Sequence, residues 1–381
     1  MRTFGVEEEL LLVDELTGRP VAVAPAALAS DRLGAPAPGP SLDAELQQEM
    51  IETATRPCET LDRLRLEILA GRARADAAAR SCGARAVALA MSPEPVDPHP
   101  TASARYDEMV ARYGRTARTN LTCGFHVHVA IESSDEGVAV LDRIRGWLPV
   151  LLALSANSPF ESGGDTGHES FRYASWMRWP TSGPLDVLGS AAAYRELEQG
   201  LLGSGVLMDA GMFYFDARLS RRYPTVEVRV MDVCLSADAA ASLAALVRGM
   251  AVRAIIDLRA GSAPLELPTP VLRLASWKAA LCGATGELLD PRAGRLRPAE
   301  DVVAALLAWS AAGLDTTGDT DEVHAGVGRI LRDGTGARRQ RMLRPLPPGE
   351  RTRALVDASH DAAIAAVGAP MVDTSQPSAY G

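Results

Sequence analysis

Four short segments of this chain place chemically capable side chains one residue apart. They are Glu7 and Glu9, His126 and His128, Asp216 and Arg218, and Glu227 and Arg229. Carboxylate and imidazole groups bind divalent cations, and arginine guanidinium groups bind phosphate or carboxylate. In a β-strand, residues two apart point to the same face of the sheet. If each segment is a strand, each one presents a pair of functional groups to one face.

The apolar residues between these side chains favour strands. In "TCGFHVHVAIE", which begins at Thr122, Phe125 and Val127 alternate with His126 and His128, so the histidines share the face opposite the apolar residues. The segment "TVEVRV" behaves in the same way, with valines on one face and Thr225, Glu227 and Arg229 on the other. In the segment "FGVEEELLLV", Glu7 and Glu9 share a face, whereas Glu8 falls among Phe4, Val6 and Leu10.

An ordinary amphipathic strand with one solvated face would show the same alternation. A solvated face is usually filled with Lys, Thr, Ser and Gln, however, and these segments carry carboxylates, imidazoles and guanidinium groups instead. Carboxylates that converge repel one another, and cations relieve that repulsion. Taken together, the segments therefore predict a metal site on one face of a sheet.

A second acidic cluster, "LDAELQQEMIE", offers Glu45, Glu49 and Glu52 as further ligands. The alternative is that this segment is a helix with a solvated acidic face. Oxygen ligands with one or two imidazoles suit Mg²⁺ or Mn²⁺ better than Zn²⁺. Because Mg²⁺ is commonly shared between carboxylates and substrate phosphates, we expect a nucleotide as well.

The basic residues restrict how a phosphate is bound. Lys278 is the only lysine in the chain, so a phosphate-binding P-loop is excluded and a protein-kinase active site is disfavoured, since both need a lysine elsewhere. A GC-rich genome explains the bias toward arginine. Any phosphate chemistry must nevertheless depend on arginines and metal ions.

The elements that must position these groups alternate irregularly along the chain. We predict strands at 3–13, 122–132, 211–220 and 225–233, the last two forming a hairpin. We predict helices at 59–82, 106–118, 136–155, 236–260, 270–282, 298–312, 320–331 and 351–367, from apolar periodicity, from the cap residue Ser236 and from the helix-ending Gly83. The aromatic, Gly-rich and Arg-rich stretch from Ser155 to Pro184 is expected to be a functional loop region. This pattern indicates an α+β fold, with a mostly antiparallel sheet and helices gathered around it.

Composition narrows the class of protein. The net charge of −9 argues against a nucleic-acid partner. No run approaches the roughly 20 apolar residues that span a bilayer, and the three consecutive glutamates from Glu7 interrupt any signal peptide, so we expect no membrane association and a cytoplasmic location. The five scattered cysteines indicate buried thiols.

Several longer motifs resemble the type-2 glutamate-cysteine ligase family, also called carboxylate-amine ligases. They are "GVEEELLLVD", "AELQQEMIETATRPC", "TCGFHVHV", "LLALSANSPFESGGDTGHESFR", "RWPTSGP", "YFDARLSRRYPTVEVRVMDVC" and "GTGARRQR". The resemblance extends from about Gly5 to Val356. It implies a glutamine-synthetase-like fold, in which one face of a curved antiparallel sheet is lined with metal and nucleotide ligands. It also implies a single domain over 1–381, sheet-rich at 1–235, mainly helical at 236–370, with a disordered tail at 371–381, and a possible homodimer.

The implied reaction is ATP-dependent amide formation. The substrate carboxylate attacks the γ-phosphate of ATP to give an acyl phosphate and ADP, and an amine then displaces phosphate. The implied substrates are a glutamate-like acid and a cysteine-like amine, or a related pair. Two departures from the family pattern, Phe215 in place of a tryptophan and the insertion Glu161-Ser162, leave the identity of the substrates open.

The resemblance also implies a role for each candidate. The metal ligands, for two or three Mg²⁺ or Mn²⁺ ions, would be Glu7, Glu9, Glu45, Glu52, His126 and Glu227. The groups on the phosphates would be His128 and Arg229, and the groups on the substrate carboxylate or acyl phosphate would be Arg172 and Arg218. Asp216 would accept the proton of the amine.

Other functions stay open at this stage. A metal-dependent amidohydrolase also uses His-x-His on a strand. An ATP-dependent phosphotransferase on a related fold would give a phosphorylated product. A binding or scaffolding protein would have the same fold without catalytic activity. The loop from Asp333 to Arg341 resembles a phosphate loop but equally a helix end beside a basic surface. Trp277 and Lys278 are expected on a helix at the rim of the cleft.

Overall fold

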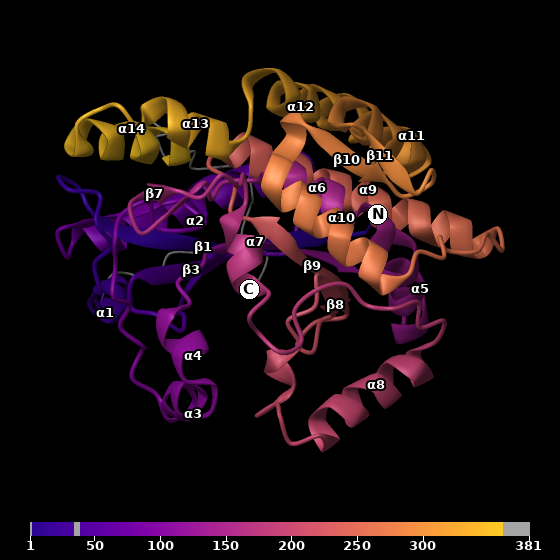
Figure 1. Ribbon diagram of the computed structural model, residues 1–381, viewed down its shortest axis with the longest axis horizontal. Helices are drawn as coiled ribbons and strands as arrows, with labels where there is room; N and C mark the ends of the chain where they lie inside the picture. The colour runs from indigo at the N-terminus through magenta and orange to yellow at the C-terminus, as the bar shows by residue number, and fades with distance from the viewer. Residues whose placement is uncertain (1, 34–38, 361–381) are drawn as a thin grey trace, which may run out of the picture.

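The computed structural model describes residues 2–33 and 39–360, and these form one large sheet surrounded by helices (Figure 1). The described sheet has seven strands, of which six lie side by side in the order β2 (Ser41–Ala44), β3 (Met50–Ala54), β1 (Phe4–Asp14), β5 (Gly124–Ala130), β9 (Thr225–Asp232) and β8 (Ala217–Leu219). The remaining strand, β4 (Ala84–Val87), pairs with the second half of β1. Every paired strand runs antiparallel to its neighbour.

The long strand β1 is central to this arrangement. Its residue Glu7 lies opposite His126 of β5, and Glu9 lies opposite Glu52 of β3. Side chains directly opposite one another in an antiparallel pair share a face and lie within contact distance. The register therefore brings the acidic, imidazole and guanidinium side chains of neighbouring strands to one face, as the alternation predicts.

The apolar face of the sheet packs against a layer of helices. The helices α2 (Leu61–Arg80) and α9 (Ala237–Arg259) contact each other and β1, and the valines of β5 and β9 belong to the same buried core. Around α9 lie α5 (Ser134–Ile144), α6 (Leu148–Ser155), α11 (Ala299–Thr317) and α12 (Thr320–Asp333). The polar face is instead flanked by α3 (Ala104–Tyr113), α4 (Arg115–Thr119) and α8 (Ala191–Gly203), which lie at the bottom of Figure 1.

Helix α9 is the core of the helical layer. Among the described residues it is the one helix long and apolar enough to cross a membrane, and 83% of its apolar window is buried inside the protein. Its N-terminus is capped by Ser236, whose side chain accepts a hydrogen bond from the Ala239 amide. The apolar character of α9 is therefore explained by packing.

Several predicted elements differ in length or kind. The strand predicted at 211–220 is a 3₁₀ turn (Ala210–Met212) followed by the three-residue β8, because residues 213–216 turn away to pair with the loop at Gly183. The helix predicted at 136–155 is α5, a 3₁₀ turn (Arg145–Trp147) and α6, with a proline in the first turn of α6. The helix predicted at 106–118 is divided into α3 and α4 at Gly114, whose φ of 55° favours glycine.

The segment with the second acidic cluster is also not a helix. It forms the hairpin of β2 and β3, so the helical alternative is wrong. The part after 236 is not wholly helical either, since β10 (Glu287–Asp290) and β11 (Arg295–Pro298) form a hairpin there. The helix predicted at 351–367 is α14 (Pro348–His360), and its last residues, like the predicted tail at 371–381, lie outside the described residues.

The remaining elements are one predicted helix, α10, and several that were not predicted or lie in the predicted loops. They are α1 (Ala24–Leu33), β6 (Phe160–Glu161), β7 (Gly164–Asp165), α7 (Phe171–Trp176), α10 (Thr269–Cys282), which was expected at 270–282, a 3₁₀ turn (Gly283–Thr285) and α13 (Gly336–Leu343). Of these, α7 and α10 lie closest to the candidate site and are described below.

Candidate active site

A cavity of about 700 Å³ opens on the polar face of the sheet. Nine of the predicted site residues line it: Glu7, Glu9, Glu45, Glu52, His126, His128, Arg218, Glu227 and Arg229. They come from five strands and from the turn after β2. The sheet thus gathers these groups from positions more than 200 residues apart in the sequence.

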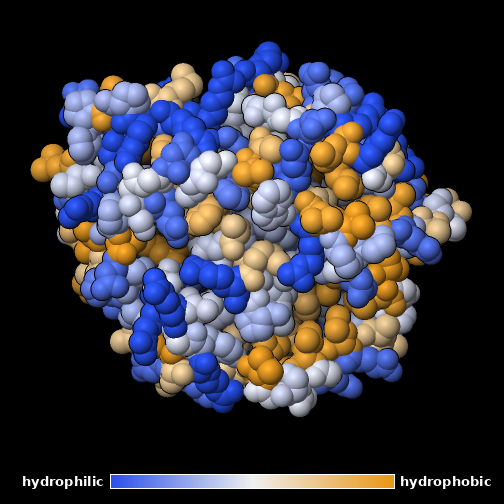
Figure 2. Space-filling view, viewed as in Figure 1, coloured by the Kyte–Doolittle hydropathy of each residue, from blue (hydrophilic) through white to orange (hydrophobic). Residues whose placement is uncertain are grey.

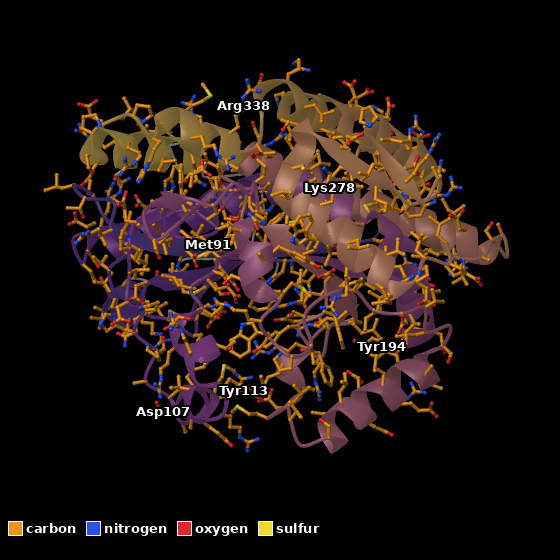
Figure 3. The ribbon with its side chains drawn as sticks, viewed as in Figure 1. Met91, Asp107, Tyr113, Tyr194, Lys278 and Arg338 are labelled. Atoms are coloured by element: carbon orange, nitrogen blue, oxygen red, sulfur yellow. The ribbon has the colours of Figure 1, made fainter. Side chains whose placement is uncertain are left out.

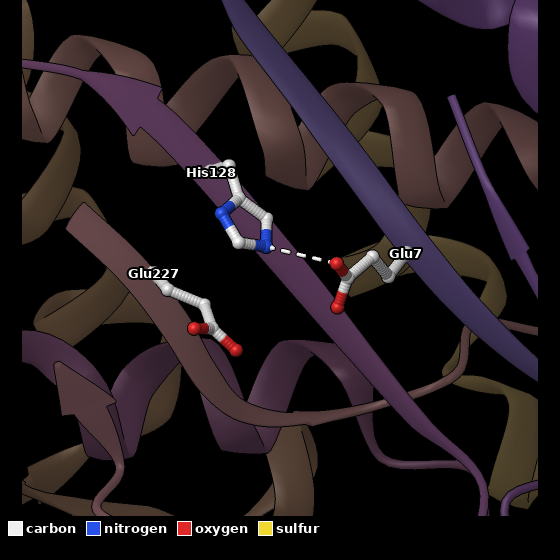
Figure 4. Close-up of side chains that lie close together, drawn as sticks. All are labelled: Glu7, His128 and Glu227. Carbon is white, nitrogen blue, oxygen red and sulfur yellow. Dashed lines mark ion pairs between the residues drawn. The ribbon is translucent and has the colours of Figure 1, made fainter. Parts of the chain in front are cut away.

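Three groups of side chains within this cavity have the spacing of metal sites. In each group the potential ligand atoms lie within 4.8 Å of one another. The groups are Glu7, His128 and Glu227 (Figure 4), then Glu7, Glu52 and His126, and finally Glu9, Glu45 and Glu52. Glu7 and Glu52 each belong to two groups, so the three positions form a continuous row across the sheet.

Glu7 is held by both histidines. His126 Nδ1 lies 3.2 Å from Glu7 Oε2, and His128 Nε2 lies 3.4 Å from Glu7 Oε1. Burial by itself raises the pKa of Glu7, but the hydrogen bonds and charges of His126 and His128 outweigh it and hold the pKa well below its usual value. Thr225 Oγ1 lies 3.0 Å from Nδ1 of His128, so the other ring nitrogen, Nε2, is directed at Glu7 (Figure 4). An imidazole oriented in this way is ready to bind a cation.

Glu45 and Glu52 have the opposite electrostatic environment. Burial and the charge of Glu9 raise the pKa of Glu45 to about 7. Burial, followed by the charges of Glu45, Glu7 and Glu9, raises the pKa of Glu52 well above its usual value. Carboxylates that are pushed together in this way repel one another. A bound divalent cation would relieve that repulsion.

Glu227 lies between two arginines. Arg218 donates two hydrogen bonds to its carboxylate, at 2.7 and 3.1 Å, and Arg229 forms an ion pair with it. Burial raises the pKa of Glu227, but Arg229 and Arg218 outweigh burial and hold it well below its usual value. Both guanidinium groups therefore face the cavity beside the row of carboxylates, in the position to contact an anion bound there.

Arg172 and Asp216 do not line this cavity. Arg172 is 2% exposed, lies 3.9 Å from Asp232 and has its guanidinium 5.7 Å from the centre of the Trp176 ring. Asp216 is buried and accepts a hydrogen bond of 3.1 Å from the hydroxyl of Tyr173, and burial raises its pKa to about 7. These two residues form the wall behind the metal groups.

The close approach of Arg172 depends on Gly124. A Cβ atom at residue 124 would lie 2.4 Å from Arg172 Nη2 and 3.0 Å from His126 Nε2. The Gly124 amide also donates a hydrogen bond of 2.5 Å to Glu9. A residue without a side chain is required here because three site residues meet at its backbone.

Three other candidates do not line this cavity. Glu49 is buried away from the three groups and binds the backbone and ring of His99, so it is not one of the clustered ligands. In the loop from Asp333 to Arg341, Arg341 forms ion pairs with Asp165 and Glu169, and the loop does not line the cavity. Figure 3 places Lys278 on α10, and neither Trp277 nor Lys278 lines this cavity.

One wall of the cavity was not predicted from the sequence. It consists of the aromatic side chains Tyr106, Trp176, Trp179 and Tyr214, together with Arg105, which is paired with Asp209, and the unpredicted residues Arg221, Arg222 and Tyr223 of the turn between β8 and β9. The three rings of Trp176, Trp179 and Tyr214 contact one another, with centroids 4.9 to 6.4 Å apart. The aromatic content of residues 155–184 was a signal for part of this wall, but its partners lie far away in the sequence.

Comparisons with known proteins agree with this geometry. Residues 3–361 match the family model of glutamate-cysteine ligase family 2. A Paenarthrobacter aurescens protein named "Putative glutamate--cysteine ligase 2-1" is 52% identical over 346 residues, which cover 90% of this chain and 90% of that protein. A Streptomyces coelicolor protein named "Putative glutamate--cysteine ligase 2" is 48% identical over 343 residues, which cover 90% of this chain and 94% of the relative.

The fold is shared with solved ligases. The crystal structure of glutamate-cysteine ligase from Francisella tularensis in complex with AMP superposes with a TM-score of 0.66 at 15% identity, covering 96% of this chain and 91% of that one. This likeness and the antiparallel sheet confirm the predicted α+β fold, with a mostly antiparallel sheet and helices around it. By its family match and its relatives, this chain belongs to glutamate-cysteine ligase family 2.

Proposed function

We propose that this protein joins a small carboxylic acid to an amine with ATP, through an acyl-phosphate intermediate, and that the acid is glutamate-like and the amine cysteine-like. The observation that carries the proposal is the row of three carboxylate and imidazole groups beside Arg218 and Arg229. Transfer of a phosphoryl group needs positioning and charge neutralisation rather than covalent help from the protein. Family membership supports the substrate class.

The side chains fit Mg²⁺ or Mn²⁺. The three groups supply mostly oxygen ligands with one imidazole in each of two groups. Burial and the neighbouring carboxylates raise the pKa of Glu45 and Glu52 despite the charge of Arg229 near Glu45. Glu7, Glu9, Glu45, Glu52, His126 and Glu227 would hold two or three ions. His128 Nε2, which is directed at Glu7, would contact an ion or a phosphate oxygen. Such ions neutralise charge on the nucleotide phosphates when they are bound.

The arginines would orient the reacting groups. Arg229 and Arg218 are held beside the cavity by Glu227, and Arg218 also donates to the backbone carbonyl of Phe213. From these positions the two guanidinium groups would bind the transferred phosphoryl group and the acid. The proposed role of Arg172, on the substrate carboxylate, is now less direct because Arg172 lies behind Gly124. From this position it would fix the backbone that binds Glu9.

Asp216 remains the proposed acceptor for the proton of the amine. Its pKa of about 7 suits a general base near neutral pH, and one carboxylate oxygen has no hydrogen bond in the described structure. Because Asp216 does not line the cavity, this role requires a movement of the wall or a water molecule between the two. A cytoplasmic location is part of the proposal.

The reaction can be tested with purified protein, ATP, Mg²⁺ and pairs of amino acids, following both free phosphate and the mass of the product. We expect amide and phosphate in equal amounts, each dependent on the amine. Glu227→Gln should reduce the rate about 10²- to 10³-fold, as the loss of a preorganised charge does. Glu196→Gln on the exposed surface of α8 is the matched control and should keep full activity.

Other products would identify the alternatives. A phosphorylated acceptor without free phosphate would replace this proposal with a phosphotransferase. Hydrolysis of an amide without ATP would replace it with an amidohydrolase.

A further inference from the structure

A second cavity, of about 430 Å³, lies between α7 and α10. Its main lining residues are His168, Tyr173, Met177, Arg273, Leu274 and Trp277. No residue lines both this cavity and the candidate active site. It is therefore a separate feature, which we name the α7–α10 cavity.

One wall of the α7–α10 cavity is apolar and exposed. Leu274 and Trp277, one helical turn apart on α10, are 66% and 55% exposed. The ring of His168 meets the Trp277 ring edge to face, with centroids 6.5 Å apart. Figure 2 shows hydrophobic side chains gathered over α10 on this face of the molecule. A large indole left open beside a hollow offers a flat surface on which a planar group can stack.

One cationic side chain, Arg273, lines the cavity. Within residues 2–33 and 39–360, Arg273 has no hydrogen bond or ion pair with another side chain. Asp165 and Glu169, in the loop before α7, both form ion pairs with Arg341, and no acidic residue lines the cavity in the described part of the chain. A guanidinium group beside an apolar surface, without a carboxylate to neutralise it, favours a ligand that carries a negative charge.

The floor of the cavity connects it with the active-site wall. Tyr173 is 3% exposed, and its hydroxyl donates a hydrogen bond of 3.1 Å to Asp216. The short helix α7 directs Tyr173 toward this cavity and Trp176 toward the candidate active site, while Arg172 packs behind Gly124. A ligand that presses on Tyr173 therefore acts on the helix that also forms the wall of the other cavity.

We propose that the α7–α10 cavity binds a small planar organic anion, with its flat body on Trp277 and its carboxylate or sulfonate on Arg273, and that binding changes the ligase rate through α7. The binding site stands on its own geometry. The effect on rate rests on the proposed function.

Binding can be measured on the full chain with 8-anilinonaphthalene-1-sulfonate as the probe, in the presence of saturating ATP and Mg²⁺. We expect saturable binding of one probe per chain and quenching of tryptophan fluorescence. Arg273→Leu should weaken binding about tenfold, the loss of one hydrogen bond to a charged group. Trp277→Ala should weaken it by a similar factor. Arg195→Leu, at an exposed arginine on α8, is the matched control and should bind as the unaltered protein does.

The outcomes separate the parts of the proposal. Equal affinities in Arg273→Leu, Trp277→Ala and the control would overturn the site, as would equal binding of the uncharged analogue N-phenyl-1-naphthylamine. Because Arg273 and Trp277 are exposed, these variants are expected to fold, which circular dichroism checks. If the probe binds as predicted but alters the rate equally in the unaltered protein and in Arg273→Leu, the site stands and its effect on α7 is wrong. Absence of any ligase activity would instead count against the proposed function alone.

Discussion

Neighbouring glutamates on the two faces of β1 have different partners. Glu8 points into the helical layer, is 1% exposed and forms a bidentate ion pair with Arg72, at 2.7 and 2.9 Å. Arg72 also donates to backbone carbonyl groups of Cys234, Leu235 and Ser359, so it ties β1 to the segment before α9 and to α14. This charge is fully satisfied by the protein.

On the other face, Glu7 and Glu9 join Glu45 and Glu52 in a crowded acidic row. Among the described residues, neither Glu45 nor Glu52 forms an ion pair with an arginine, and burial together with the neighbouring carboxylates raises the pKa of both. A buried charge with a partner inside the protein, such as Glu8, stabilises the fold. Buried carboxylates that lie close together without such a partner are typical of a ligand-binding site. The difference can be tested by removing one member of each kind.

The largest effect is expected on the free energy of unfolding, when the buried ion pair of Glu8 and Arg72 is broken. Arg72→Met removes the cation and leaves the Glu8 carboxylate buried, which should lower the free energy of unfolding by about 3–5 kcal/mol. The double variant Glu8→Gln with Arg72→Met should recover part of that loss, because the buried charge is gone. Urea denaturation of the three proteins measures both values. Equal stability of the single variant and the unaltered protein would contradict the structural role of the pair.

For the row of carboxylates on the other face of β1, we expect a substitution to reduce activity without reducing stability. Glu52→Gln removes a ligand shared by two metal groups and should reduce the rate about 10²- to 10³-fold. In the absence of metal, the same change relieves repulsion from Glu45, Glu7 and Glu9, so the free energy of unfolding should stay the same or rise. Ligase assays and denaturation in the presence of a chelator check the two halves. A strong destabilisation would place Glu52 with the structural charges.

Gly124→Ala should reduce both the stability of the protein and its affinity for metal, by smaller amounts. The added methyl group would meet Arg172 and His126, so we expect a destabilisation of about 1–3 kcal/mol from overpacking and a weaker affinity for Mn²⁺. Gly200→Ala is the control, since it adds a methyl group on α8 with no atom within 4 Å. Calorimetric titration with Mn²⁺ and thermal denaturation measure both effects. Equal behaviour of the two variants would mean that the wall behind Gly124 is loosely packed.

The smallest effect is the pH dependence of the metal-free protein. The pKa of Glu45 is raised to about 7 in the folded state, above that of the unfolded chain, so folding takes up a proton. This contribution is fully present at acid pH and is lost as pH rises through about 7. We expect the melting temperature in a chelator to fall by a few degrees between pH 6 and 8, and Mg²⁺ to cancel the fall. A melting temperature that rises over this range would contradict the repulsion within the acidic row.

Much of the candidate site was predictable because strands have a fixed period. Alternation in single segments placed His126 with His128, Glu7 with Glu9 and Glu227 with Arg229, and it separated Glu8 from its neighbours. The same rule failed for Asp216 and Arg218, because the chain around them is a turn followed by a very short strand. As a result Arg218 faces the cavity and Asp216 lies behind its wall.

The spacing of the second acidic cluster could not predict which of its glutamates line the cavity. Glu45, Glu49 and Glu52 lie close together in the sequence, but the hairpin of β2 and β3 sends the outer two into the cavity and turns Glu49 toward His99. The aromatic wall was hidden for a similar reason. Its residues come from α3, α7 and the loop before β8, and only the packing of these segments brings the rings together.

The sequence by itself determined the period of the strands, the chemistry of the side chains on each face and, through its motifs, the family. These properties are local, since they depend on residue type and on neighbours a few positions away. The tertiary structure alone decided which strands lie side by side, which acidic groups meet without a cation, and which arginines are already paired. These properties depend on register and packing between residues that can be more than 200 positions apart, which no local pattern records.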